Sequence, residues 1–132
     1  MWYDTLKRIY QADEQQWGPE DPANERIERC YDVFYETHQE DLAHYFRTLY
    51  HLIKLVKFSE VIVEYKDKRR YTSLARAQLS AFELTLLFYD GASKHGKGFK
   101  PWIEEFGLLE HINKDHLLLP SHAGLYSEAA YK

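Results

Sequence analysis

The 132-residue chain lacks several features that would place it in a large class of proteins. Its single cysteine, Cys30, excludes an internal disulfide and favours a reducing compartment. No apolar run is long enough to span a bilayer and the first residues have no signal-peptide core. These absences predict a soluble, cytoplasmic protein without membrane insertion.

Motifs for nucleotides and metals are also missing. There is no glycine-rich phosphate loop, no dinucleotide fingerprint, no HExxH and no cysteine pair. The C-terminal histidines and acid have spacings that match no standard metal motif: His111, Asp115, His116 and His122. We therefore expect no cofactor and no metal ion.

The chain also lacks a large excess of charge of either sign. A net charge of −4 and a pI near 6.0 argue against a protein that coats nucleic acid by bulk positive charge, although a local basic patch can still bind phosphate. Tyrosine, by contrast, is abundant, with 11 copies. Aromatic side chains are enriched in interface cores, which makes a homo-oligomer the expected state. The tyrosines that suggest such a surface are Tyr3, Tyr10, Tyr31, Tyr35, Tyr126 and Tyr131.

Helical periodicity dominates what remains. Apolar residues recur at helical spacing from Trp2 to Gln16 and over 40–57. A further helix is expected between these segments, with Asn24 or Asp21 as its N-cap and apolar residues on one side as far as Tyr35. The segment 71–91 is apolar around nearly its whole circumference, which predicts a central helix, and Gly91 suits its C-terminal stop. A shorter helix is expected over 101–113, and VIVEY (61–65) is interpreted as helix or helix–loop. The prediction is an all-α, compact bundle of about five helices.

WGPEDPAN (17–24) is the one convincing linker, since it contains two prolines, a glycine and acids. It divides the chain into an N-terminal helical arm with its linker, residues 1–20, and a helical domain, residues 21–132.

Two stretches in order carry a resemblance. HYFRTLYHLIKLV (44–56) and RRYTSLARAQLSAFELTLLFYDG (69–91) resemble the C-terminal domain of AbiC-like phage abortive-infection proteins, and FKPWIEEFGLLEHI (99–112) resembles that family's next segment. The resemblance covers roughly 34–113 and implies a bacterial antiviral role in which the protein helps to halt the infected host cell. Because several abortive-infection families belong to the helical HEPN superfamily of metal-independent RNases, the analogy extends to a HEPN-like bundle and an endoribonuclease toxin. The alternative is a non-catalytic binding or oligomerisation module that senses a phage component or partners another defence protein.

The strongest catalytic hypothesis lies on the segment 40–57. Its apolar residues point one way, while His44, Arg47 and His51 share the opposite face at helical steps of three and four. Histidine can donate or accept the protons of RNA cleavage, and arginine matches a phosphate. The alternative is the solvated or interface side of an amphipathic helix, which the spacing by itself favours. The arginine-to-histidine spacing of the HEPN signature is absent.

Polar residues within the apolar segment 71–91 form a second candidate set. Arg76, Ser80 and Glu83 are expected along one side of a helix and partly buried, so each needs a partner on another helix. Glu83 is predicted to take part in catalysis, with a pairing to Arg47 as one testable form. A polar network that fixes helix register is the favoured alternative.

Basic residues in two loops or helix ends are candidates for binding RNA or another phosphate. GASKHGKGFK (91–100) offers cations on glycine-rich backbone, and KDKRRY (66–71) adds more, although surface loops are often rich in lysine and glycine. The predicted phosphate-binding residues are Arg69, Arg70, Arg76, Lys94 and Lys97.

Overall fold

The computed structural model describes residues 2–17 and 23–132. The helices in order are α1 (Trp2–Trp17), α2 (Ala23–Lys57), α3 (Tyr65–Arg76), α4 (Ala81–Ala92) and α5 (Lys100–Glu105), followed by 3₁₀ turns at Lys114–His116, Pro120–Leu125 and Glu128–Tyr131. The described residues contain no strand, which confirms the all-α prediction. None of the helices in these ranges is both long and apolar enough to cross a membrane. Most of the predicted linker, residues 18–22, lies outside the described residues.

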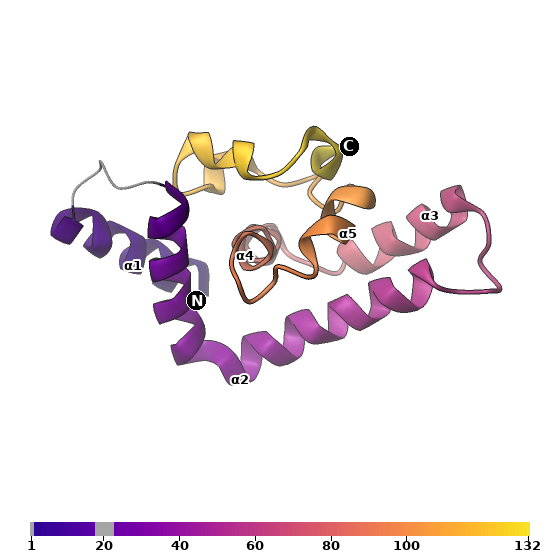
Figure 1. Ribbon diagram of the computed structural model, residues 1–132, viewed down its shortest axis with the longest axis horizontal. Helices are drawn as coiled ribbons and strands as arrows, with labels where there is room; N and C mark the ends of the chain where they lie inside the picture. Colours follow the sequence, from indigo (N-terminus) through magenta and orange to yellow (C-terminus); the bar gives the residue numbers. More distant parts are fainter. Residues whose placement is uncertain (1, 18–22) are drawn as a thin grey trace.

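One long bent helix replaces the two helices expected between residues 24 and 57. α2 leaves helical geometry at His38, where φ is −117° and ψ is 15°, and then resumes its course. Figure 1 shows the consequence: the two halves of α2 meet at an angle, and α4 and α5 lie within that angle. The bend creates a concave side on which a pocket lies.

α4 is the central element, as the apolar segment predicts. Every residue from Leu84 to Gly91 is buried, and Figure 1 shows the helix end-on in the middle of the molecule. Phe34, Leu42 and Ile53 of α2 and Ile103 of α5 belong to the same hydrophobic core. Burial on all sides fixes α4 firmly, so a polar group it presents to a cavity is held in place.

The predicted single helix over 71–91 is wrong, because the chain breaks between Arg76 and Ala81. Ser80 begins α4: its Oγ accepts a hydrogen bond from the Glu83 backbone N–H at 3.1 Å, and a Glu83 carboxylate oxygen accepts one from the Ser80 N–H at 2.8 Å. This reciprocal pair is a capping box, and its S-x-x-E pattern precedes the apolar run in the sequence. Arg76 therefore lies on a different helix from Glu83.

Gly91 does not end α4, and this expectation also needs correction. The helix continues to Ala92, and a Cβ atom on Gly91 would collide with the Tyr126 hydroxyl and the Ile103 Cδ1 atom. Glycine is needed there for close packing. The helix expected over 101–113 ends at Glu105, since the chain turns at Gly107, where φ is +57°. Residues 61–64 form a loop before α3.

α1 is joined to α2 by a buried cation. The Arg26 guanidinium lies 4.1 Å from the ring centroid of Tyr10 and 3.3 Å from carboxylate oxygens of both Asp13 and Glu14. Leu6 and Tyr10 belong to the hydrophobic core. The boundary predicted near residue 20 stays a prediction.

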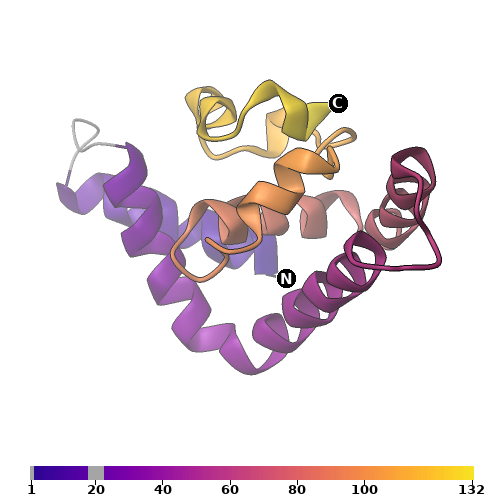
Figure 2. The ribbon, with the colours of Figure 1, turned by 45° about the vertical axis from the view of Figure 1, so that its right-hand side comes forward.

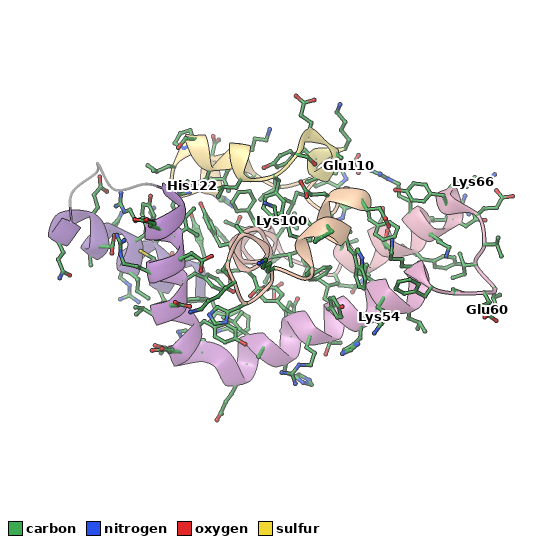
Figure 3. The ribbon with its side chains drawn as sticks, in the orientation of Figure 1. Lys54, Glu60, Lys66, Lys100, Glu110 and His122 are labelled. Atoms are coloured by element: carbon green, nitrogen blue, oxygen red, sulfur yellow. The ribbon has the colours of Figure 1, made fainter. Side chains whose placement is uncertain are left out.

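A second buried polar cluster holds the C-terminal turns. The Tyr89 hydroxyl accepts a hydrogen bond from the Leu118 N–H at 2.7 Å and shares a second hydrogen bond, of 2.8 Å, with His122 Nδ1. The other ring nitrogen of His122 is hydrogen-bonded to the Tyr10 hydroxyl at 3.4 Å. Figure 3 labels His122 at the base of these turns. Burial, together with the Arg26 charge, lowers the pKa of His122 from 6.5 to about 4, so the imidazole is neutral in the folded protein.

This buried histidine predicts an acid-sensitive contact. The charged imidazole is disfavoured in the folded state, so its contribution to stability is intact above pH 6.5 and is lost as the pH falls towards 4. Relative to a His122→Gln variant, the wild type should lose about 2 kcal/mol of unfolding free energy between pH 7 and pH 5. Urea unfolding at the two pH values measures the difference, and parallel behaviour of the two proteins would contradict it.

Candidate functional site

A pocket of about 310 Å³ lies inside the bend of α2. Figure 2 shows the segment between α4 and α5 lying within this bend. The pocket walls come from both halves of α2, from the end of α4 and from the loop 93–99. The lining residues used below are Tyr35, Arg47, Tyr50, Asp90, His95 and Gly96.

His95 is held in a defined orientation at the edge of this pocket. Its Nε2 atom lies 2.7 Å from the Asp32 carboxylate, and its ring stacks on Tyr35 with centroids 3.8 Å apart and an interplanar angle of 14°. Desolvation raises the pKa of Asp32, but hydrogen bonds from Lys94 and His95 outweigh it and bring the net pKa below the usual value. Asp32 is thus an anion beside the imidazole. A carboxylate that holds one ring nitrogen in this way fixes the orientation of the imidazole.

Asp90 is a buried carboxyl group on the same pocket. Burial raises its pKa from 3.8 to about 6, although the Tyr31 hydrogen bond and the charge of His95 act in the opposite direction. The Tyr31 hydroxyl donates to Asp90 Oδ1 at 2.8 Å. The backbone of Gly96 packs closely against the second carboxylate oxygen, where any Cβ atom would clash. A carboxyl group that titrates near neutrality can take up or release a proton during a reaction.

Arg47 supplies positive charge on the α2 side. Its side chain lines the pocket, is exposed, and forms no ion pair with any residue that the structure describes. Lys94 and Lys97 belong to the loop that carries His95. Lys94 Nζ pairs with Asp32 Oδ2 at 2.9 Å, whereas Lys97 is exposed. The pocket therefore combines two titratable side chains, Asp90 and His95, with the exposed cation of Arg47.

The other predicted catalytic residues lie outside this pocket. His44 borders a separate apolar groove with Gln78 and Leu79, and His51 is exposed beside the ring of Tyr50. Glu83 lines a third cavity. Within one chain, the structure brings only Arg47 of this set into the pocket inside the bend of α2.

The suggested pairing of Glu83 with Arg47 is wrong. The Glu83 carboxylate closes the capping box of α4, and its charge and hydrogen bond contribute, after burial, to raising the pKa of Tyr45 to about 12. Its oxygens are therefore engaged at the start of α4, whereas Arg47 faces the pocket. Whether Glu83 contributes to catalysis stays a prediction.

The predicted phosphate-binding residues fall into two groups. Lys94 and Lys97 belong to the pocket loop, while Arg69, Arg70 and Arg76 are on α3. The Arg69 guanidinium packs against Gly107, and Arg70 is exposed, 4.0 Å from Asp67. Arg76 is buried, and its Nε atom has no hydrogen-bond partner among the described residues.

Two further side chains bear on the chemistry that the chain can perform. Cys30 is buried, and burial together with the charge of Asp13 raises its pKa to about 11, so it is a thiol and not a reactive thiolate. In the residues that the structure describes, no group of three or more histidine, cysteine or acidic side chains is arranged to hold a metal ion.

Asp90, the carboxyl group that lines the pocket, and Asp32, which holds His95, were not predicted from the sequence, and His95 was expected only as part of a basic loop. One signal was available: Asp90 directly follows the apolar run LTLLFY, where an acid is expected to be buried and therefore to have a shifted pKa. The proximity of Asp32 to His95 depends on the tertiary fold, and no local pattern predicts it.

The fold and the pocket define an all-α protein with a concave pocket lined by Asp90, His95 and an exposed arginine. Comparison with protein families matches residues 37–117 to the family described as "Putative phage abortive infection protein". The match spans more than half of the chain and contains Arg47, Asp90 and His95. The protein belongs to this phage abortive-infection family, as the resemblance of its motifs implied. Searches of curated proteins and of solved structures found no match.

Proposed function

We propose that the protein acts in anti-phage defence as a metal-independent endoribonuclease and that the pocket inside the bend of α2 is its active site. The observation that carries the proposal is the presence of Asp90, His95 and Arg47 around one cavity. The family supports the defence role, and the three side chains supply the groups that RNA cleavage needs. HEPN-like character, suggested by analogy alone, is not required for this chemistry.

Each side chain has a role that follows from its environment. Asp90, with a pKa of about 6, is ionised at pH 7 and can take the proton from the ribose 2′-hydroxyl. The 2′-oxygen attacks phosphorus, and the bond from phosphorus to the 5′-oxygen breaks. His95, whose ring is held in place by Asp32, gives a proton to that leaving oxygen. Arg47 binds the phosphate oxygens, whose negative charge increases in the transition state.

A cleavage assay tests the proposal directly. Purified protein is incubated with RNA in the presence of EDTA, and products are examined for a 2′,3′-cyclic phosphate. His95→Asn should lower the cleavage rate by at least about 100-fold, the usual contribution of a positioned proton donor. His111→Asn, which alters an exposed histidine outside the pocket, serves as the matched control. Absence of cleavage by the wild type, or equal activity of both variants, would contradict the nuclease.

A binding or oligomerisation module is the second candidate function, and a specific observation favours it. Large apolar side chains are exposed on α2 and α3, where Leu55 is 71% exposed and Leu74 is 58% exposed. Exposed apolar residues grouped on one part of a protein commonly mark an interface. A homo-oligomer, or a complex with a phage or defence-system protein, would cover them. Phage protection that persists without any RNA cleavage would favour this function over the nuclease.

A further inference from the structure

A row of aromatic rings leads away from the pocket. Tyr50 forms part of the pocket wall and stacks on Trp102 of α5, with centroids 4.8 Å apart and an interplanar angle of 13°. Phe58 follows at the end of α2, with its ring 6.0 Å from that of Trp102 and an interplanar angle of 71°. Although it is large and apolar, Phe58 is 62% exposed. Burial in the core therefore does not explain its position.

Cations alternate with these rings along the same face of α2. Arg47, Tyr50, Lys54 and Phe58 succeed one another at steps of three, four and four, so a single helix face carries cation, ring, cation and ring. Lys54 is exposed and forms no ion pair with a described residue (Figure 3). Lys57 lies 5.9 Å from the Trp102 ring, but Glu105 at 2.7 Å neutralises it. The free positive charges of the row are thus Arg47 and Lys54.

We infer that this row, consisting of Arg47, Tyr50, Lys54, Phe58 and Trp102, binds the nucleotides that flank the cleaved phosphate, and that the substrate is single-stranded RNA. The inference rests on the proposed function. Exposed rings can stack on bases only where the bases are not already paired and stacked in a duplex, whereas cations contact the backbone of either form. A row that alternates the two kinds of side chain therefore favours a single strand over a double strand.

The geometry of the row fits a short stretch of a strand. Arg47 and Phe58 are 11 positions apart on a helix, which corresponds to about 16 Å along its axis. This length accommodates a few nucleotides beyond the pocket. Because the row begins at Arg47, one strand can place a phosphate in the pocket and its neighbouring bases against the exposed Phe58 ring and the half-buried pair of Tyr50 and Trp102.

Binding of an uncleavable RNA tests the inference separately from cleavage. The probe is a fluorescent 2′-O-methyl oligonucleotide of about ten nucleotides, measured by anisotropy as a single strand and as a blunt duplex. The wild type should bind the single strand at least about tenfold more tightly than the duplex. Phe58→Ala should weaken single-strand binding by about 5- to 30-fold. Leu55→Ala, which removes a neighbouring side chain of similar exposure, should change it less than about twofold.

A charge variant adds a second readout. Lys54→Gln should reduce the slope of log K against log salt by about 0.7, the value for one phosphate contact on a single strand. Equal affinity for the duplex, no measurable binding of the single strand, or equal effects of Phe58→Ala and Leu55→Ala would overturn the inference even if His95-dependent cleavage is found. If the wild type binds the single strand through Phe58 but does not cleave RNA, the row is an RNA-binding surface and the proposed nuclease activity is wrong.

Discussion

Asp90→Asn is expected to lower RNA cleavage by at least about 100-fold and at the same time to make the protein more stable at every pH above about 4. The carboxyl group is buried with a pKa of about 6 instead of 3.8, so its ionised form is disfavoured in the folded state. Its contribution to stability is fully present below pH 3.8 and is lost as the pH rises through 6. Asparagine keeps the oxygen that accepts the Tyr31 hydrogen bond but carries no charge.

The size of the stability effect follows from the shift in the pKa of Asp90. A difference of about two units corresponds to about 3 kcal/mol, so the variant should be more stable than the wild type by about this amount at pH 8 and by about 1 kcal/mol at pH 4.5. Loss of the general base should lower the cleavage rate by at least about 100-fold. Denaturant unfolding at the two pH values, together with a cleavage assay, measures both quantities.

Asp115→Asn is the control, because Asp115 is an exposed acid outside the pocket. It should leave cleavage unchanged and should alter stability by less than about 0.5 kcal/mol. A destabilised Asp90→Asn variant would mean that the carboxylate is required for folding, and a fully active one would remove Asp90 from the reaction.

The helices could be predicted from the sequence because their apolar residues repeat regularly, and the structure confirms the central burial expected for the segment that became α4. The breaks were harder to predict. The bend at His38 depends on how the two halves of α2 pack around α4, and no proline or glycine marks it. The break before Ala81 was predictable in principle, since Ser80 and Glu83 have the spacing of a capping box.

The pocket was predictable only in part, for a similar reason. Arg47 and the basic loop around His95 stand out locally as charges beside apolar or glycine-rich sequence. Asp32 and His95 are 63 positions apart, and they meet because the bend of α2 receives the loop after α4. Two residues that meet only through tertiary folding have no regular spacing in the sequence. The helical spacing of His44, Arg47 and His51, by contrast, can be recognised in the sequence even though these residues border different surfaces of the protein.

The second large effect is expected for Arg47, which lines the pocket although the two histidines on the same helix face do not. Arg47→Ala should lower RNA cleavage by about 100-fold and abolish phage protection, because it removes the exposed cation at the mouth of the pocket. Arg47→Lys should restore part of the activity, since it returns the charge without the forked geometry of the guanidinium. Activity assays on purified variants, with phage plaque counts on cells that express them, provide both measurements.

The matched variants are His44→Ala and His51→Ala, one turn on either side of Arg47 and both exposed. We expect each to retain cleavage within about threefold of the wild type, because neither side chain lines the pocket that holds Asp90 and His95. If instead both histidine variants were as inactive as Arg47→Ala while His95→Asn remained active, the reacting phosphate would bind on the outer face of α2. In that case the face of one copy would need a second copy opposite it to enclose the substrate, and the concave pocket would serve another purpose.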